Sequence, residues 1–265
     1  MANHTPLASW LYSKRTQLNA RFREFNWPSR IFPGVFDFET TISWQGIEAN
    51  GRGVDSSREI ALEKSVAEAI ERLICLTLGF DSVGFAIAGT HDPSQHAKNE
   101  CLERFFLNEH LKNGTSLYNA NVDFPEAEKL KILAPTAEVS FYRMNTPKNL
   151  FGISCRIHLA DSKKTSLGFA LSETLDHAAR RSFFEALPSF AWLASDEKLE
   201  LNELPWHLKT EFIEKLESLF AEDDRLKADQ MKSPSLSSIE LDLTSLPIFE
   251  GAPIQTARYQ IASLE

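Results

Sequence analysis

Glu68-Ala69-Ile70-Glu71-Arg72 and Glu100-Cys101-Leu102-Glu103-Arg104 share one pattern, a glutamate, two further residues and then Glu-Arg. On a helix, the spacing of three places the two carboxylates of each copy on nearly one face, about one turn apart. Two such helices that face each other would bring four carboxylates together. Buried isolated charges cost several kcal/mol each, so the four would require cations. Mg²⁺ fits best, because it prefers oxygen ligands and usually arrives with phosphates.

Both copies lie in segments with the pattern of a helix. The first is predicted over residues 58–78, where a polar residue at 55–57 can cap the start and Gly79 can end it. The second is predicted over residues 94–111, and Asn113-Gly114 can end it. The first helix is apolar almost all round, so we expect it to be buried.

Glu71 occupies an unusual position on the first predicted helix. On an ideal helix it falls within about 20° of Ile60 and Leu78, which places a carboxylate among core residues. The alternative is that Glu68 and Arg72, four residues apart, form an ordinary surface ion pair.

Length and composition exclude several classes of protein. The chain has 265 residues and is 43% hydrophobic, which indicates one globular domain with small appendages. A net charge of −9 argues against a nucleic-acid or anionic-membrane binder. The three cysteines match neither a zinc site nor a disulfide framework, so a reduced, cytoplasmic protein is the simplest interpretation. The N-terminus lacks signal-peptide features, and no apolar run approaches the roughly 18 residues of a membrane span.

The residues before the first acidic pattern predict a helix, strands and a turn. Apolar residues at helical spacing favour an N-terminal helix over residues 7–25, and residues 35–47 have the pattern of one or two strands. The turn is Asn50-Gly51-Arg52-Gly53, whose glycines would let the backbone approach a ligand while Arg52 reaches across it. The alternative is a plain strand-to-helix turn with a surface arginine.

The second half of the chain predicts a β-meander and then helices. A helix over residues 174–187 should end near Pro188, and within it Arg181 and Glu185 could form a plain helical pair. The C-terminal part predicts a helix over residues 209–232. The predicted strands cover residues 83–88, 138–144, 151–159, 166–171, 238–243 and 254–261.

In this order, the motifs resemble the YcaO family, whose members use ATP and Mg²⁺ to activate a peptide backbone amide. Residues 50–53 and 61–73 are similar to that family's glycine turn and first acidic helix. The second acidic pattern, preceded by residues 84–89, looks like its second acidic helix. Residues 167–170 with 178–185 are similar to its third block, so the resemblance runs from about residue 50 to 187.

The resemblance implies an α+β fold with helices packed on largely antiparallel sheets. The expected organisation is a single domain over residues 1–265. It would comprise an N-terminal helix within 1–30, the core within 31–190, and a helical region with closing strands within 191–265.

The resemblance also implies the ligands. Glu68, Glu71, Glu100 and Glu103 would hold Mg²⁺ against the phosphates of ATP. The residues that would contact the nucleotide or its phosphates are Arg52, Lys64, Ser65, Arg72, His96, Arg104 and Arg181. Arg52 stands where the family has a lysine, and Lys64 and His96 align with a serine and a glutamine of the family. No catalytic residue is identified.

The implied reaction modifies a ribosomally made peptide or a protein. A neighbouring nucleophile, such as a cysteine or serine side chain or sulfide, adds to the amide carbon. ATP phosphorylates the amide oxygen, which leaves as phosphate and gives an azoline, amidine or thioamide. A separate protein would present the peptide, and relatives are often dimeric, so we expect a homodimer or a heteromeric complex. The alternative is a non-catalytic scaffold or partner subunit, which the short segment between the acidic patterns and the altered polar positions favour.

Overall fold

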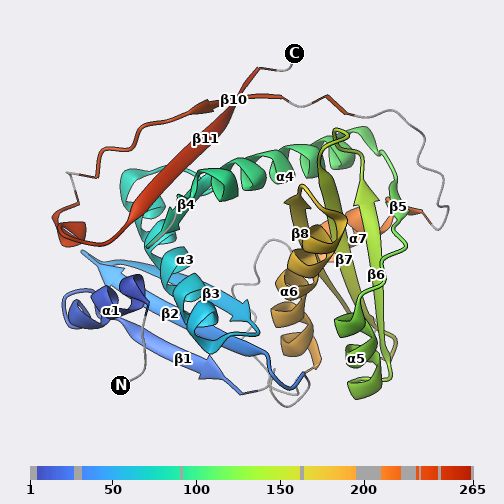
Figure 1. Cartoon of the computed structure of the whole chain (residues 1–265), viewed down its shortest axis with the longest axis horizontal. Coiled ribbons are helices and arrows are strands. Elements are labelled where there is room, and N and C mark those ends of the chain that lie inside the picture. The colour runs from blue at the N-terminus through green and yellow to red at the C-terminus, as the bar shows by residue number, and fades with distance from the viewer. Residues whose placement is uncertain are drawn as a thin grey trace. The chain divides into compact units, whose positions relative to one another are not determined.

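The structure is a computed structural model that describes residues 5–26, 32–89, 92–161, 164–194, 210–221, 231–232, 234–243 and 246–263. The chain forms two compact units. The first combines residues 1–101 with 235–263, and the second comprises residues 102–234 with the last two residues. Figure 1 labels the elements of both. The expected organisation as a single domain over residues 1–265 stays a prediction.

The first unit begins with a helix and an antiparallel sheet. Helix α1 (Pro6–Ser13) precedes strands β1 (Arg21–Phe25), β2 (Phe36–Trp44) and β3 (Ile47–Asp55), which follow one another in the order β1-β2-β3. Helix α3 (Arg58–Leu78) comes next and packs on β2 and β3. Helix α1, strands β1 to β3 and helix α3 therefore follow one another directly along the chain.

The predicted N-terminal helix over residues 7–25 is wrong in its second half. Helix α1 ends at Ser13, the backbone reverses at Asn19, which has a φ of 45°, and residues 21–25 form β1. Helical spacing of apolar residues continues past Ser13, but pairing of β1 with β2 satisfies the backbone of that segment instead.

The predicted turn at residues 50–53 is also wrong. The reversal lies earlier, at Gln45-Gly46, where both residues have positive φ, and residues 50–53 belong to β3. A Cβ on Gly51 would lie 2.2 Å from the backbone nitrogen of Ala69, and one on Gly53 would lie 2.0 Å from the α3 backbone. These glycines therefore allow close helix packing and do not form a loop.

Helix α3 has the predicted bounds. Ser57 accepts a hydrogen bond from the third backbone N–H of the helix, and Gly79 ends it in the left-handed conformation. The expectation that α3 is buried all round is wrong, because Ile60 is 48% and Leu76 is 55% exposed. The helix is amphipathic, with one face on the sheet and one toward solvent.

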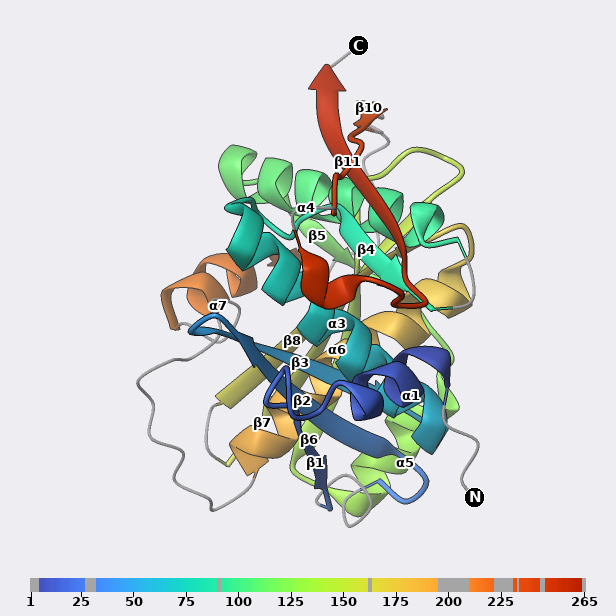
Figure 2. The same ribbon diagram turned by 90° about the vertical axis from the view of Figure 1, so that its left-hand side faces the viewer.

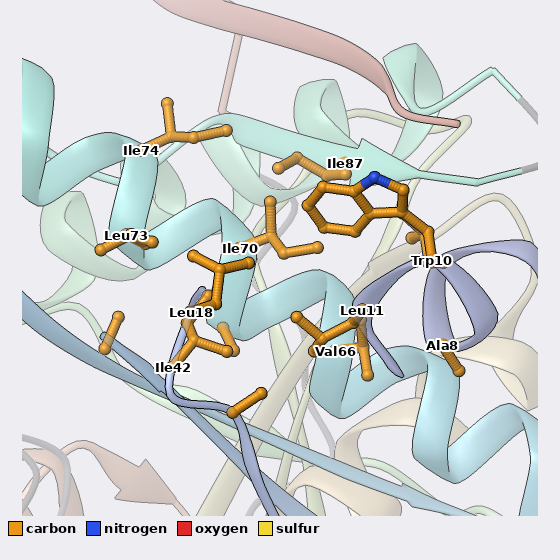
Figure 3. Packing of buried hydrophobic residues seen from close by; sticks show 14 of the residues in the cluster. Ala8, Trp10, Leu11, Leu18, Ile42, Val66, Ile70, Leu73, Ile74 and Ile87 are labelled. Carbon is orange, nitrogen blue, oxygen red and sulfur yellow. The ribbon is translucent and has the colours of Figure 1, made fainter. Parts of the chain in front are cut away.

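The core of the first unit lies between α1, α3 and β2 (Figure 3). Leu11 of α1 lies beside Val66 and Ile70 of α3, and Ile42 of β2 faces the same helix. All four side chains are completely buried. Each Å² of buried apolar surface stabilises the fold by about 25 cal/mol, so this contact holds α3 in place.

A second sheet completes the first unit, in the order β10-β11-β4. Its strands are β4 (Phe85–Ala88), β10 (Ser235–Ser238) and β11 (Gln255–Ser263), with a short 3-10 helix, η3, at Pro247–Phe249. Figure 2 shows β11 running beside β4. The strand predicted over 238–243 is wrong, since β10 ends at Ser238. The strands predicted near β4 and β11 are confirmed.

Helix α4 (Ser94–Asn113) carries the second acidic pattern and contributes residues to both units. The second unit contains a five-stranded sheet in the order β8-β7-β6-β5-β9, antiparallel except for the β5–β9 pair. The predicted meander is confirmed. The strands are β5 (Leu117–Asn119), β6 (Ala137–Met144), β7 (Phe151–Leu159), β8 (Lys164–Ser172) and β9 (Phe220–Ala221).

Helix α6 (Leu175–Ala194) lies against β7 and β8 (Figure 1). The predicted end near Pro188 is wrong, because Pro188 lies inside the helix. Phe190 and Ala191, which follow the proline, are completely buried, so their packing outweighs the lost backbone hydrogen bond.

Two shorter helices complete the second unit, α5 (Pro125–Leu133) and α7 (Thr210–Glu217). The helix predicted over residues 209–232 is wrong beyond Glu217, where the chain enters β9. Lys209 and residues 222–230 lie outside the described residues. The mixed α and β fold class with largely antiparallel sheets is confirmed. Among the helices in the described ranges, none combines the length and apolarity that crossing a membrane requires.

His110, near the end of α4, is completely buried. Its Nδ1 lies 2.9 Å from the Thr115 carbonyl oxygen, and its Nε2 accepts the Asn145 backbone N–H at 2.9 Å. Burial lowers the pKa of this imidazole below its ordinary value of 6.5. The folded chain therefore holds His110 neutral, with one ring nitrogen as donor and the other as acceptor.

This histidine should make stability depend on pH. Below about pH 6.5 the unfolded chain gains a proton that the folded chain resists, so the free energy of unfolding should fall until the lowered folded pKa is reached. The His110→Gln variant should lack this part of the slope. Urea unfolding at several pH values between 5 and 7.5 tests it, and equal slopes in both proteins would contradict it.

Candidate functional site

Three of the four predicted metal-binding glutamates belong to the first unit. Glu68 and Glu71 lie one turn apart on α3, and Glu100 lies on α4. Glu68 accepts the backbone N–H of Arg52 at 2.6 Å with one oxygen, and the guanidinium of Arg72 binds the other. Strand β3 and the next helical turn thus hold this carboxylate in place.

Glu71 has a perturbed carboxyl group. Its pKa lies well above its ordinary value of 4.5, first because burial removes water and then because the charges of Glu100 and Glu68 act on it. The positive charge of Arg72 offsets this only in part. The structure therefore brings three of the predicted carboxylates within interaction range, and their mutual repulsion favours a bound cation.

The fourth glutamate, Glu103, follows Glu100 by one turn on α4 and is 4% exposed. It belongs to the second unit. Because both residues lie on one helix at a spacing of three, their side chains leave nearly the same face. Its membership in a metal site stays a prediction.

The carboxylates match the chemistry of a hard divalent cation, whose ligands are oxygens. Within the described residues, no three His, Cys, Asp or Glu side chains are placed so that they could hold a metal ion together. Both oxygens of Glu68 already accept hydrogen bonds. Binding of Mg²⁺ would therefore require these side chains to turn toward the ion.

Arg52, the predicted phosphate contact of residues 50–53, pairs with Asp37 in the structure. Its Nε lies 2.9 Å from Oδ1 and its Nη2 2.6 Å from Oδ2, and the guanidinium also lies over the ring of Phe25. Asp37 is completely buried. Sequence reasoning missed this aspartate, and the hairpin register, which places both side chains on one face, is the signal that reveals it.

Removing Arg52 should destabilise the fold because Asp37 would stay buried without a counter-charge. For Arg52→Met we expect the free energy of unfolding to fall by about 2 kcal/mol, below the value for a fully buried pair because Arg52 is partly exposed. Arg21→Met, which removes an exposed pair, should change it by less than about 0.5 kcal/mol. Chemical denaturation measures both, and equal small effects would disprove the buried pair's importance.

Lys64 and Ser65, the next predicted nucleotide contacts, bind other residues of the first unit. The Lys64 Nζ lies 2.7 Å from the Asp55 carboxylate. The buried Ser65 hydroxyl lies 2.7 Å from that of Thr40 and donates to the Leu62 carbonyl at 2.8 Å. Ser65 therefore links α3 to β2.

The remaining predicted contacts are spread over several elements. Arg72 also donates to the Asn50 carbonyl at 2.9 Å, and His96 lies exposed near the start of α4. Arg104 and Arg181 belong to the second unit, where Arg181 donates to the Leu171 carbonyl at 3.2 Å. The structure thus gathers Arg72 with the three glutamates and leaves the nucleotide roles as predictions.

Cys75 lies one turn after Glu71 on α3. Burial, and then the negative charge of Glu71, raises the pKa of its thiol to about 12. The thiol stays protonated at neutral pH, so Cys75 is a poor nucleophile. The negative charge of Glu71 therefore acts on Cys75 as well.

No family model matches the sequence, and no curated protein matches it either. Solved structures do match. The YcaO from Methanopyrus kandleri bound with AMPPCP and Mg²⁺ has a TM-score of 0.65 at 10% identity, over 96% of this chain and 89% of that protein. A heterocyclase in complex with substrate and cofactor has a TM-score of 0.66 at 10% identity, over 100% of this chain and 53% of that one. The chain has a YcaO-like fold, and it spans about half of that heterocyclase.

Proposed function

We propose that the chain uses ATP and Mg²⁺ to activate a peptide backbone amide by phosphorylating its oxygen. A neighbouring nucleophile adds to the amide carbon and the oxygen leaves as phosphate, with an azoline, amidine or thioamide as the product. The amide belongs to a ribosomally made peptide or a protein. The YcaO-like fold supports this proposal, because one protein with that fold holds AMPPCP and Mg²⁺ and another holds its substrate.

The observation that carries the proposal is the grouping of three carboxylates: Glu68 and Glu71 lie one turn apart on α3, and the charges of Glu68 and Glu100 both act on Glu71. A carboxylate that burial and the nearby Glu100 and Glu68 destabilise gains most from a divalent cation. We propose Glu71 and Glu100 as the principal ligands, with Glu68 and Glu103 one turn away on the same helices. Bound Mg²⁺ and ATP would supply the positive charge and the phosphoryl group of the reaction.

The chain's own residues would hold and orient these groups. Glu68 binds the Arg52 N–H and Arg72, which holds α3 against β3, and the acidic side chains would turn toward the ion from this fixed helix. The Arg72 guanidinium lies beside the carboxylates and can turn toward phosphate oxygens. Arg104 is proposed to do the same from α4. Lys64, Ser65, His96 and Arg181 remain nucleotide contacts by resemblance alone.

The peptide would come from a separate recognition protein. The active form is proposed as a homodimer or a heteromeric complex, in the cytoplasm. Size-exclusion chromatography with light scattering would show whether the purified chain is larger than a monomer.

Calorimetric titration of the purified chain with Mg²⁺ and a non-hydrolysable ATP analogue tests the proposed function. We expect saturable binding that EDTA removes. Absence of binding, or binding that persists in a Glu71→Gln, Glu100→Gln double variant, would refute it.

A second candidate is a non-catalytic scaffold or partner subunit. Arg52, Lys64 and Ser65, each predicted to contact the nucleotide, have structural partners here, which favours this role. It predicts no ATP turnover with any peptide and partner binding that survives the double substitution.

A further inference from the structure

Two segments of the chain have the same strand-strand-helix construction. In the first, β2 and β3 precede α3, and in the second, β7 and β8 precede α6. Strands β3 and β8 are each nine residues long, and each helix begins three residues after its strand ends. Each of these strands also lies at the edge of its sheet.

A glycine allows the same close packing in both segments. A Cβ on Gly51 would lie 2.2 Å from a carbonyl oxygen and 2.2 Å from a nitrogen of the α3 backbone. A Cβ on Gly168 would lie 2.1 Å and 2.5 Å from the matching atoms of α6. The matched positions are Gly51 and Gly168, Ser65 and Ser182, and Ala69 and Ala186.

A glutamate binds the strand backbone next to each glycine. In the first segment Glu68 accepts the N–H of Arg52 at 2.6 Å, and in the second Glu185 accepts the N–H of Phe169 at 3.1 Å. An N–H on the outer side of an edge strand has no strand partner. The helix supplies one in each case.

A cation binds the same strand two residues further on. Lys64 lies 3.4 Å from the Val54 carbonyl oxygen, and Arg181 lies 3.2 Å from that of Leu171. The two buried serines repeat as well, since each hydroxyl donates to the carbonyl three residues earlier. The two members of every matched pair are separated by the same interval of 117 residues, as in Gly51 and Gly168.

We propose that the chain contains two copies of one strand-strand-helix module, and that Glu185 is a positioning residue equivalent to Glu68. Each glutamate, together with Lys64 or Arg181, anchors its helix to the edge of its strand. The packing glycine, the carboxylate anchor and the cation anchor all recur at the same interval, which supports one repeated module.

The copies differ one turn after the anchor. Glu71-Arg72 of the first copy corresponds to Pro188-Ser189 of the second, so the second helix keeps the anchor and lacks the acidic turn. In terms of the proposed function, the anchor at Glu68 sets where α3 presents Glu71. Glu185 has no ligand role, and the anchor contacts of Lys64 and Arg181 take the place of the nucleotide contacts that resemblance alone suggested for them.

Glu185→Ala and Glu185→Gln separate an anchor from a metal ligand, because glutamine keeps an acceptor oxygen and loses the charge. The amide of Phe169 should exchange its hydrogen at least tenfold faster in Glu185→Ala and at the wild-type rate in Glu185→Gln. The melting temperature should fall by about 4 °C in the alanine variant only. Mg²⁺ affinity, measured by titration with MgCl₂, should stay within threefold of wild type in Glu185→Gln.

An unchanged Phe169 exchange rate in Glu185→Ala would overturn the proposal, and so would fast exchange or tenfold weaker Mg²⁺ binding in Glu185→Gln. If the alanine variant fails to fold, the exchange rate in Glu185→Gln decides alone. Failure of the proposed function would appear separately, as wild-type protein that does not bind Mg²⁺ but shows the expected exchange pattern.

Discussion

Glu71→Gln should abolish the stabilisation by Mg²⁺. For the wild type, Mg²⁺ at about one hundred times its dissociation constant should raise the melting temperature by about 5–8 °C. The variant should show no rise, and any ATP turnover should fall at least tenfold. The reason is that Glu71 is a proposed metal ligand, and burial and its acidic neighbours destabilise its charge, which a cation would offset.

Glu71 also gives the metal-free chain a pH dependence of known sign. Its folded pKa lies above the ordinary value of 4.5, so the folded chain binds this proton more tightly than the unfolded chain. The free energy of unfolding should therefore rise as the pH falls from the folded pKa toward about 4.5. Mg²⁺ competes with the proton, so its affinity should weaken over the same window. Glu71→Gln should lack both effects.

Glu128→Gln is the matched control, because it removes one exposed charge from α5. Thermal unfolding with and without Mg²⁺ should give the same shift in this variant as in the wild type. A normal Mg²⁺ shift in Glu71→Gln would show that the metal binds elsewhere.

Gly51→Ala should cause the largest loss of stability. The added methyl group would lie 2.2 Å from backbone atoms of Ser65 and Ala69, and backbone atoms cannot move aside as a flexible side chain can. Helix α3 would have to shift off β3, which breaks the Arg52–Glu68 hydrogen bond. We expect the free energy of unfolding to fall by about 4 kcal/mol. Chemical denaturation would measure it.

Gly152→Ala is the matched control for a strand glycine. The nearest atoms to its added methyl group belong to the side chains of Met144 and Thr146, which can move. We expect a loss below about 1.5 kcal/mol. If Gly51→Ala were as mild as this control, the close packing of α3 on β3 would be incorrect.

The sequence predicted best the elements whose signals are local. Helix α3 has a capping serine and a terminal glycine, and the meander of β6, β7 and β8 has clear alternation and turns. The errors arose where distant contacts outweigh local preference. Pro188 stays helical because the residues after it are buried, and residues 50–53 are a strand because α3 packs on their glycines.

In the candidate site too, local signals were predicted and distant contacts were not. The spacing of Glu68, Glu71 and Glu100 predicted carboxylates in proximity, and the raised pKa of Glu71 is consistent with it. The partner of Arg52 could not be predicted, because Asp37 becomes its neighbour only through the hairpin register. The repeated module was equally hidden, since its copies share few identical residues and are matched mainly by backbone contacts.

We propose above all that Glu71 and Glu100 bind a divalent cation. Anomalous diffraction from crystals soaked in Mn²⁺ with a non-hydrolysable ATP analogue tests it most directly. We predict a manganese peak within ligand distance, about 2.0–2.3 Å, of both carboxylates, in contact with the analogue's phosphates. Nucleotide density without such a peak, or manganese bound only at other residues, would contradict the claim.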